Sequence, residues 1–347
     1  MKNILLCFGG NSSEHEISLI SAQNIINNID ENKYNIFKVY LSLNCQWKYV
    51  KDKKIGNVSK TYESLDNVVL FNDGNAVFLY NLEKKHSIAQ IDFAFPILHG
   101  KNGEDGAIQG LFNMLNLPYA GSSISGACLS MDKEISKILV NNINIPIVDY
   151  LVWMTHDKAY PYDYIIAQLG LPFIMKPCNS GSSIGVYKIC CEDDYEKALV
   201  EIAKLDSKVL IEEFLEIREI ECGVIGNDVP QSSPVIGEVT SNDEFYSYSA
   251  KYDHTLNTNI FIPASVSNEI KQIIQEYSVR IYKRLQCLGF ARVDFFLTKD
   301  NVVIFNELNA IPGFTDMSMF PLLWSEKFNN TTELITMLIE VGEQLKK

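Results

Sequence analysis

Four polar residues near the C-terminal end are spaced so that they could bind a metal ion. Strand alternation in "GFARVDFF" would place Arg292 and Asp294 on one face. In the next strand-like segment, "VVIFNELN", it would place Phe305, Glu307 and Asn309 on one face. Carboxylate and amide oxygens are the ligands that Mg²⁺ prefers. We therefore predict a magnesium site formed by Asp294, Glu307 and Asn309, the alternative being a structural arginine–glutamate pair on a solvated sheet face.

The register of these two segments depends on the turn "TKDN" between them. We predict a two-residue turn centred on its Lys and Asp. This turn would set Arg292 opposite Glu307 and Asp294 opposite Phe305. Residues opposite each other project to the same side, so the polar side chains would share one face.

The stretch "KPCNSGSSIGV" could support two kinds of chemistry. Its core "GSSIG" (181–185) matches the nucleophile elbow of serine hydrolases, with Ser183 as nucleophile. It also matches a Gly/Ser hairpin that closes over phosphates, with Lys176 supplying positive charge. An elbow requires a helix after the serine, whereas the following "VYKI" alternates like a strand. Only His254 of the five histidines follows Ser183, so we favour the phosphate-binding hairpin, with a plain surface turn as the alternative.

A polar loop, "HGKNGEDG", follows the buried strand-like run at 91–98. It contains His99, Lys101, Glu104 and Asp105. We predict that it contacts a substrate at the end of a strand. The alternative is an ordinary polar loop with a structural histidine.

Composition excludes several classes of protein. The 347 residues suffice for two or three domains, and a hydrophobic content of 47% is that of a globular protein. A net charge of −13 disfavours nucleic acid as a partner. The eight cysteines lack metal-binding spacing and are predicted to be free thiols. The N-terminal apolar run is too short for a signal peptide, and no stretch reaches the about 18 apolar residues of a membrane span.

The elements that position these residues begin with an N-terminal sheet. The run 3–8 predicts a buried strand, a Gly-rich turn follows at 9–18, and apolar residues then recur at helical spacing, namely Ala22, Ile25, Ile26 and Ile29. Ser12 and Ser13, with Glu16, are predicted to cap this helix. Strand, glycine loop and helix recur around the polar loop described above. This pattern predicts an open parallel sheet with ligand loops at the strand ends.

The rest of the chain is less regular. Strands are predicted at 171–177, 185–189 and 208–215. Residues 227–255 are polar, rich in Ser and Tyr, and predicted to be mostly irregular, which is typical of a lid or binding loop. A terminal amphipathic helix is predicted within 329–345.

Taken together, these stretches resemble the ATP-grasp family of D-alanine–D-alanine ligases. The likeness runs almost end to end, through "CFGGNSSEHEISLIS", "FPILHGKNGEDGAIQGLFNMLNLPYAGSS", "SMDK", "FIMKP…GSSIGV", "VLIEEFL", "FYSYSAKY", "GFARVDFF" and "NELNAIPGFTDMSMFP". The blocks "HGKNGEDG…QG" and "ARVDFF…NELNAIPGFT" are highly specific to this family and its close relatives.

The resemblance implies an α/β (mixed α+β) ATP-grasp fold of three subdomains, the first containing a doubly wound parallel sheet. These would be an N-terminal substrate-binding domain at 1–121, a central subdomain at 122–215 and a C-terminal catalytic subdomain at 216–347. The implied activity is ATP- and Mg²⁺-dependent ligation of two D-alanine molecules through a D-alanyl phosphate, for peptidoglycan synthesis. A cytoplasmic homodimer with small-molecule substrates, no nucleic-acid partner and no membrane insertion is expected.

A nucleotide and metal site follows from the same resemblance. Its residues would be Lys133, Lys176, Ser183 and Lys251 at the ATP phosphates, Glu212 and Leu215 at the adenine, and Glu219 at the ribose. Asp294, Glu307 and Asn309 would hold two Mg²⁺, for which Mn²⁺ is a possible substitute.

Substrate contacts are implied as well. They are Glu14 at the amino group of the first D-alanine, His99 beside its carboxylate, Arg292 and the Gly313 N–H at the oxyanion, and Ser318 and Met319 at the second amino acid. Tyr252, Ser182 and Glu14 would form a hydrogen-bonded set that closes the long loop over the site.

Three positions depart from the family pattern. Ala310 stands where Thr is usual, Glu213 where Lys is common, and Asp316 where small or neutral residues are usual. These departures bear on substrate preference. The alternatives are a resistance-type ligase that makes D-alanyl-D-serine or D-alanyl-D-lactate and, more distantly, a non-catalytic ATP-binding regulatory protein. Met319 and Tyr252 favour the dipeptide ligase.

Overall fold

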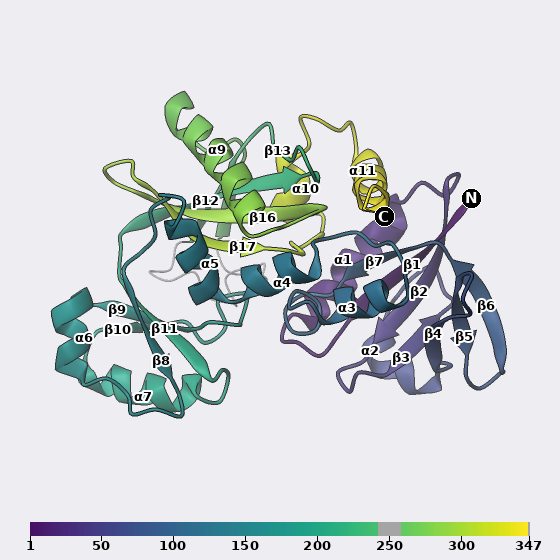
Figure 1. Cartoon of the computed structure of the whole chain (residues 1–347), viewed down its shortest axis with the longest axis horizontal. Coiled ribbons are helices and arrows are strands. Elements are labelled where there is room, and N and C mark those ends of the chain that lie inside the picture. The colour runs from purple at the N-terminus through teal and green to yellow at the C-terminus, as the bar shows by residue number, and fades with distance from the viewer. Residues whose placement is uncertain (242–257, 346–347) are drawn as a thin grey trace.

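The molecule is elongated, with its β-sheets spaced along the long axis (Figure 1). The computed structural model describes residues 1–241 and 258–345. The N-terminal sheet lies at one end, and a sheet built from residues 150–213 lies at the other. Between them lies a sheet built from residues 217–309.

The N-terminal sheet has the strand order β3-β2-β1-β7. Its members are β1 (Lys2–Gly9), β2 (Tyr34–Leu41), β3 (Trp47–Val50) and β7 (Phe93–Ile97). Strand β1 pairs in parallel with both β2 and β7, which confirms the open parallel sheet. The edge strand β3 is antiparallel. Nearly every residue of β1 and β7 is buried, as expected for parallel strands covered on both faces.

Helix α1 (His15–Asn28) follows β1 and buries the predicted apolar residues in the core. The predicted serine cap is wrong. Glu14 occupies the N-cap position, and its side chain makes no capping hydrogen bond. The Ser12 hydroxyl instead accepts the Glu14 backbone N–H at 3.2 Å, within the turn before the helix. The local turn therefore uses the serine that the capping pattern assigned to the helix.

A smaller antiparallel sheet flanks this region, in the order β4-β5-β6. Its strands are β4 (Val68–Asn72), β5 (Val77–Asn81) and β6 (His86–Ile91). Nearby helices are α2 (Val58–Thr61), the 3₁₀ helix η1 (Tyr62–Ser64) and α3 (Ala107–Met114). The polar loop that begins at His99 joins β7 to α3, so it lies at a strand end as predicted.

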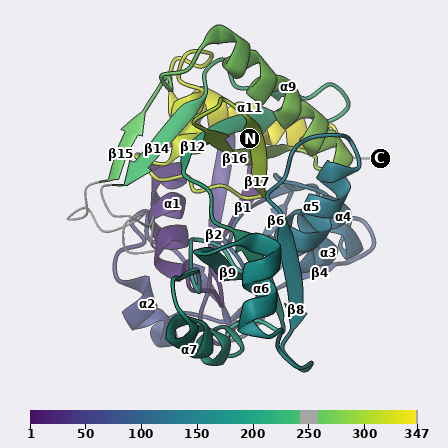
Figure 2. The same cartoon turned by 90° about the vertical axis from the view of Figure 1, so that its left-hand side faces the viewer.

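Helices α4 (Ile124–Met131) and α5 (Lys133–Asn141) lead to the second sheet, ordered β10-β9-β11-β8. Its strands are β8 (Tyr150–Met154), β9 (Phe173–Pro177), β10 (Tyr187–Ile189) and β11 (Lys208–Glu213). Helices α6 (Tyr162–Leu169) and α7 (Glu192–Ile202) pack on its outer face (Figure 2). Phe173 and Met175 point into that packing, so alternation directs Lys176 to the opposite face.

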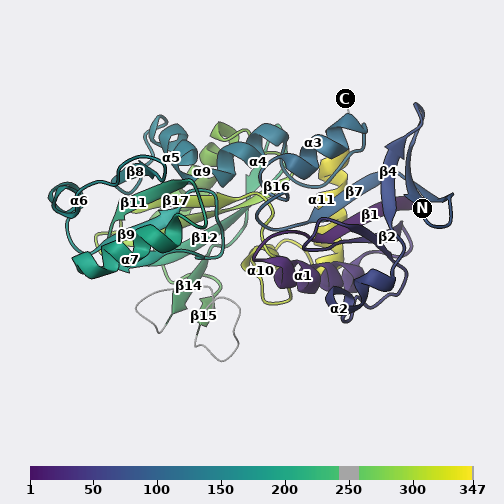
Figure 3. The ribbon, with the colours of Figure 1, turned by 90° about the horizontal axis from the view of Figure 1, so that it is seen from below.

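The third sheet follows the order β15-β14-β12-β16-β17. It consists of β12 (Ile217–Ile225), β14 (Gly237–Ser241), β15 (Thr258–Phe261), β16 (Phe290–Thr298) and β17 (Val303–Asn309), with β13 (Gln231–Ser232) paired to β12. Helix α9 (Asn268–Arg284) covers one face. Figure 3 shows β14 and β15 extending from the body of the molecule.

The prediction that 227–255 is mostly irregular is wrong for two segments. Residues 231–232 form β13, and residues 237–241 form β14. Strand β14 pairs with β12 on one side and with β15 on the other. These long-range pairings override the polar, turn-rich local sequence. The part of the predicted lid from 242 to 255 lies outside the described residues.

The hairpin of β16 and β17 has a register different from the predicted one. Arg292 lies opposite Asn309, and Asp294 lies opposite Glu307. One cause is a three-residue loop in which Asn301 adopts a positive φ of 62°. The other is a bulge beyond Asp294. As a result Phe305 turns into the hydrophobic core, and its predicted place on the polar face is wrong.

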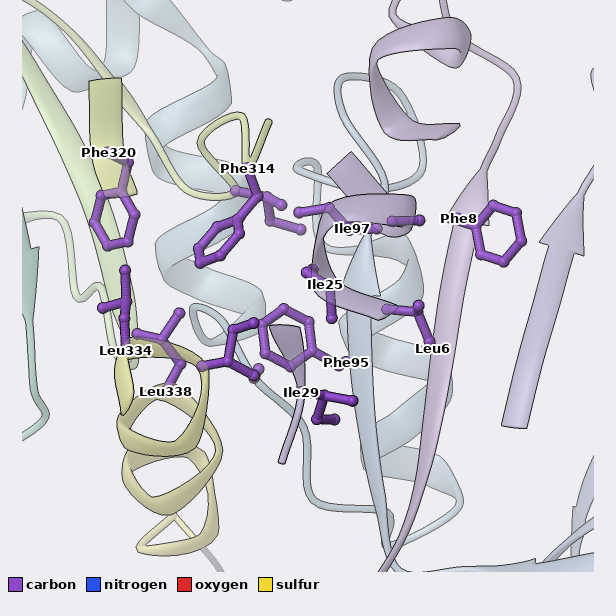
Figure 4. Packing of buried hydrophobic residues seen from close by; sticks show 14 of the residues in the cluster. Leu6, Phe8, Ile25, Ile29, Phe95, Ile97, Phe314, Phe320, Leu334 and Leu338 are labelled. Carbon is purple, nitrogen blue, oxygen red and sulfur yellow. The ribbon is translucent and has the colours of Figure 1, made fainter. Parts of the chain in front are cut away.

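The C-terminal helix α11 (Thr331–Glu343) confirms the predicted terminal helix and packs against the N-terminal sheet. Figure 4 shows Leu334 and Leu338 of α11 in the same core as Phe95 of β7 and Ile25 of α1. Helix α10 (Met319–Leu323) extends this core through Phe320. Among the described residues no helix is long and apolar enough to span a membrane.

Candidate active site

The Gly/Ser loop joins two antiparallel strands. Met175 of β9 lies opposite Tyr187 of β10, so a strand follows the loop and the hairpin prediction is confirmed. This arrangement does not provide the strand–turn–helix geometry of a nucleophile elbow. Ser182 and Ser183 have φ values of 52° and 58°, a left-handed conformation uncommon for serine and typical of tight functional loops.

A cavity of about 530 Å³ opens beneath this loop, within the range of about 300–1,000 Å³ common for ligand sites. Most predicted nucleotide and metal residues line it, namely Lys133, Lys176, Ser183, Glu212, Leu215, Glu219, Asp294 and Glu307. Asn309 borders a smaller adjoining hollow together with Lys133 and Glu307. The fold therefore gathers side chains from the second and third sheets and from α5.

A buried ion cluster lies at one side of the cavity. The Glu212 carboxylate lies 2.7 Å from Lys137 Nζ and 2.6 Å from Lys176 Nζ. All three side chains are almost completely enclosed. Burial disfavours the charged carboxylate, but the two lysines outweigh it and lower the pKa of Glu212 to about 2. The cluster has one more cation than anion, which suits a site for a polyanion.

Acid should lower the folding stability of the protein by protonating Glu212 in this cluster. The pKa of Glu212 is about 2 in the fold against an ordinary 4.5, so its stabilising effect is complete above about pH 4.5 and is lost as the pH falls toward 2. In the Lys137→Met variant the pKa of Glu212 should rise, because one of its two cations is gone. Thermal unfolding between pH 5 and 3 should then show a shallower fall of Tm than in wild type. An equal or steeper fall would contradict this assignment.

A row of three carboxylates crosses the third sheet. Glu221 on β12 lies opposite Asp294 on β16, and Asp294 lies opposite Glu307 on β17. All three line the cavity. Arg292 donates to both oxygens of Asp294, at 2.8 and 2.7 Å, and its Nε lies 2.7 Å from Glu221 Oε2. The Asn309 amide donates to Asp294 Oδ2 at 2.8 Å.

Lys133 begins helix α5 and reaches toward this row. The helix is capped by Asp132, whose carboxylate accepts the Ile135 N–H at 3.1 Å. Lys133 Nζ lies 3.1 Å from Glu307 Oε2 and donates to the Ser180 carbonyl at 2.6 Å. Lys133 thus links Glu307, one of the predicted metal ligands, to the Gly/Ser loop.

The predicted metal ligands have oxygen donors suited to Mg²⁺. Asp294 and Glu307 supply carboxylate oxygens, and Asn309 supplies an amide oxygen. Among residues 1–241 and 258–345, no group of three or more His, Cys, Asp or Glu side chains is arranged to hold a metal. The predicted set of two carboxylates and one amide is compatible with an ion that also binds water and substrate phosphate oxygens.

The N-terminal part of the chain contributes a second group of side chains. Glu14, at the start of α1, is buried and accepts a hydrogen bond from the Ser182 hydroxyl. Gly181 lies so close that a Cβ there would be 3.0 Å from Glu14 Oε2. The Gly/Ser loop therefore closes directly onto the first predicted substrate residue.

His99 and Glu104 anchor the polar loop to the segment after β17. His99 Nδ1 lies 2.9 Å from the Ile311 carbonyl, and burial lowers the pKa of the imidazole. Glu104 accepts the N–H groups of Gly100 and Ile311 at 2.9 and 2.8 Å. Burial, with the nearby Glu14 charge, raises the pKa of Glu104 to about 8.

Gly313 and Ser318 also lie together. A Cβ on Gly313 would be 3.0 Å from the Ser318 hydroxyl, which in turn accepts the Thr315 N–H at 2.9 Å. Met319 is buried in the core against Gly237. The predicted residues Lys251 and Tyr252, and His254, lie outside the described residues.

The structure adds four residues that sequence reasoning did not assign to the site: Lys137, Glu221, Asn306 and Glu104. Lys137 is four residues after Lys133 on α5, so helical periodicity could have found it. Glu221 is two residues after Glu219, so strand alternation could have found it. Asn306, which lies 3.4 Å from Lys176 Nζ, depends on the bulge and had no local signal. Glu104 stood in the polar loop without an assigned role.

Comparison with protein families matches both parts of the chain. A family model described as D-ala D-ala ligase N-terminus matches residues 3–122. One described as D-ala D-ala ligase C-terminus matches residues 139–340. The D-alanine–D-alanine ligase of Proteus mirabilis is 39% identical over 346 residues, covering 98% of this chain and 94% of that protein. That of Ruminiclostridium cellulolyticum is 41% identical over 358 residues, covering 98% and 95%.

Solved structures give the same result. The VanG D-Ala:D-Ser ligase of Enterococcus faecalis has a TM-score of 0.87 at 32% identity and covers 98% of this chain and 99% of its own. The D-alanine–D-alanine ligase of Coxiella burnetii has a TM-score of 0.84 at 30% identity and covers 99% and 95%.

Proposed function

The chain belongs to the D-alanine–D-alanine ligase family and has its ATP-grasp fold, and we propose that it uses ATP to join two D-alanine molecules for peptidoglycan precursor synthesis. One observation carries the proposal. Cations, carboxylates and a Gly/Ser loop from separate parts of the chain line one cavity of nucleotide size. The products would be D-alanyl-D-alanine, ADP and phosphate.

The chemistry explains why these residue types are needed. A carboxylate is a poor electrophile, so its oxygen first attacks the ATP γ-phosphorus and forms an acyl phosphate with ADP as leaving group. The neutral amine of the second D-alanine then attacks the acyl carbon. This gives a tetrahedral oxyanion, and phosphate leaves when it collapses, while the attacking nitrogen gives up one proton. Positive charge must therefore surround the phosphates and the oxyanion.

For the nucleotide, we assign the phosphates to Lys133 and Lys176, with Ser183 in the loop above them. This assignment is supported by the position of Lys133 and Lys176, which both line the cavity. Lys251 is assigned to the phosphates from the family pattern. Adenine is assigned to Glu212 and Leu215 on and after β11, and the ribose to Glu219 on β12, all of which line the same cavity.

Asp294, Glu307 and Asn309 are proposed to hold two Mg²⁺, with Mn²⁺ as a substitute. When bound, the ions would neutralise charge on the β- and γ-phosphates. Supporting this, Asp294 and Glu307 are direct cross-strand neighbours on the cavity face. Chelation with EDTA should abolish ADP release, and added Mg²⁺ should restore it.

The amino-acid subsites are assigned to residues near the start of α1, in the polar loop after β7, on β16 and after β17. Glu14 would bind the first ammonium group, and His99 would lie beside the first carboxylate. The Arg292 guanidinium and the Gly313 N–H would stabilise the oxyanion. Ser318 and Met319 would line the second subsite. The enclosed Glu14–Ser182 contact supports a site that closes over its substrate.

Closure protects the intermediate. Acyl phosphates react with water, so the loop must exclude solvent before the second amine attacks. Ser182 already bonds to Glu14, and Tyr252 is proposed to complete this set from the long loop.

The second substrate decides between two members of the same family. The VanG relative of 32% identity is named a D-Ala:D-Ser ligase, so D-serine is the specific alternative, followed by D-lactate. We propose D-alanine, because Met319 and Tyr252 fit the dipeptide pattern. Asp316, on the short segment before Ser318, is the residue to examine if the preference differs.

A coupled ADP-release assay tests the proposal. Purified protein is given ATP, Mg²⁺ and D-alanine, alone or with D-serine or D-lactate, and products are identified by mass. Turnover with D-alanine alone and one dipeptide product is the expected result. A mixed product would move the chain to the resistance-type ligases. No ADP from any mixture would favour a non-catalytic ATP-binding protein.

Replacing Lys133 with methionine should raise the KM for ATP by roughly 10- to 100-fold, because a charged hydrogen bond contributes about 1.5–3 kcal/mol. The matched control is Lys204→Met, whose ammonium is exposed and pairs with Glu201 at the surface. Steady-state kinetics at saturating D-alanine measure the effect. An unchanged KM for ATP in the Lys133 variant would remove this lysine from the phosphate site.

Three further proposals concern the whole chain. We propose subdomains at 1–121, 122–215 and 216–347, a homodimer, and a cytoplasmic location, where ATP is supplied. Light scattering on the purified protein tests the dimer, and cell fractionation tests the location.

A further inference from the structure

Glu221 lines the cavity of the proposed site, although it is assigned no role there. It lies on β12, directly opposite Asp294. The residue is 7% exposed and borders the cavity. A carboxylate buried to this degree needs a cation partner or strong hydrogen bonds, because burial of an unpaired charge is costly.

Its partner is Arg292. Arg292 Nε lies 2.7 Å from Glu221 Oε2. The same guanidinium donates from Nε and Nη2 to the two oxygens of Asp294. The Arg292 guanidinium therefore contacts two carboxylates. Asp294 lies on its own strand, β16, and Glu221 lies on the neighbouring strand, β12.

Asp294 is shared between Arg292 and the proposed cation. Both of its oxygens are engaged by Arg292, and one also accepts from the Asn309 amide. An ion bound at Asp294 and Glu307 would compete for the same oxygens. Such an ion would draw negative charge from Asp294 and weaken its hold on Arg292. Glu221 provides a second carboxylate that holds the guanidinium in place.

We propose that Glu221 is a positioning residue that keeps Arg292 aimed at the reacting carbon while Asp294 binds the cation, an inference that rests on the proposed function. Glu221 acts through Arg292 and need not touch the substrate. Its negative charge, and not its size alone, is the property that matters.

A comparable pair on the same sheet provides a control. Glu238 on β14 is 6% exposed and binds Arg218 at 2.7 and 2.6 Å. Glu238→Gln removes a buried carboxylate from a guanidinium pair of similar geometry, but away from Asp294. Any loss that comes only from a weakened sheet should appear in both variants.

The first experiment compares Glu221→Gln with Glu238→Gln. In Glu221→Gln, kcat for dipeptide formation should fall by roughly 10- to 100-fold, the usual cost of losing a residue that orients an active-site group. The KM for ATP should stay within about twofold, as expected when ground-state binding is preserved. Glu221→Asp should recover part of kcat. Equal losses in the two glutamine variants, or no recovery with Asp, would overturn the proposal.

A second readout needs no turnover. Calorimetric titration of ATP at increasing Mg²⁺, without D-alanine, gives the Mg²⁺ concentration for half-maximal binding. It should rise several-fold in Glu221→Gln, because Mg²⁺ must then draw charge away from Arg292 without the Glu221 carboxylate to balance it. An unchanged value would overturn the proposal. If the wild type makes no dipeptide, the proposed function fails, while this titration still tests Glu221.

A double-mutant cycle isolates the route through Arg292. Glu221→Gln should lower kcat strongly in the wild type but little in the Arg292→Lys background, because interacting residues are non-additive. The same fold-loss in both backgrounds would show that Glu221 acts independently of Arg292 and would refute the proposal.

Discussion

Replacing Arg292 with alanine should lower kcat for ligation by about 10²- to 10³-fold, the loss typical of removing one oxyanion donor. The guanidinium is mostly buried and is held by Asp294 and Glu221. This fixed orientation means that it needs no rearrangement when charge develops on the acyl oxygen. The KM for ATP should change much less, because we assign the phosphates to lysines on other elements.

The measurement is steady-state kinetics with dipeptide quantified by mass, alongside thermal unfolding. Arg280→Ala is the control, since Arg280 lies on α9 and pairs with Glu276 at the surface. A stable Arg292→Ala protein with near wild-type kcat would show that another group stabilises the oxyanion.

Replacing Glu212 with glutamine should destabilise the protein by about 3–5 kcal/mol, because it leaves two buried lysines without their shared counter-ion. Lys137 and Lys176 both depend on this carboxylate, at 2.7 and 2.6 Å. Lys137→Met should cost less than about 1.5 kcal/mol, since it leaves one balanced ion pair and a side chain of similar volume. Comparing the two variants separates the cost of leaving buried lysines without a counter-ion from the cost of altered packing.

Urea unfolding followed by circular dichroism tests this contrast, with ligand-free protein so that ATP binding does not contribute. Equal destabilisation by both variants would show that Lys137 is as necessary to the cluster as Glu212. A Glu212→Gln protein as stable as wild type would mean that a lysine loses its proton or reaches solvent.

Local patterns predicted which residues face the site but not how strands align. Alternation correctly grouped Arg292, Asp294, Glu307 and Asn309, because successive strand residues point to opposite faces, but it misplaced Phe305, which the bulge turns into the core. Their register was wrong, because it depends on the left-handed Asn301 and on a bulge. Asparagine favours left-handed backbone but does not fix the length of the loop, and the bulge has no strong signal in the residue types.

Contacts between segments that are distant in the sequence could not be predicted from local sequence patterns either. Glu104 reaches the Ile311 N–H, more than 200 residues away, and its raised pKa arises from burial that only the folded chain creates. The family resemblance, by contrast, could assign Glu14 and Ser182 to one site, and their hydrogen bond brings them together.

The packing of α11 against the N-terminal sheet has a consequence for how the chain is made. Leu334 and Leu338 share a core with Phe95 and Ile25, and Glu343 forms an ion pair with Lys2. During synthesis the first strands leave the ribosome long before the helix that covers them. Until residues 331–343 have emerged, the part of this face that α11 covers stays open to water and to chaperones.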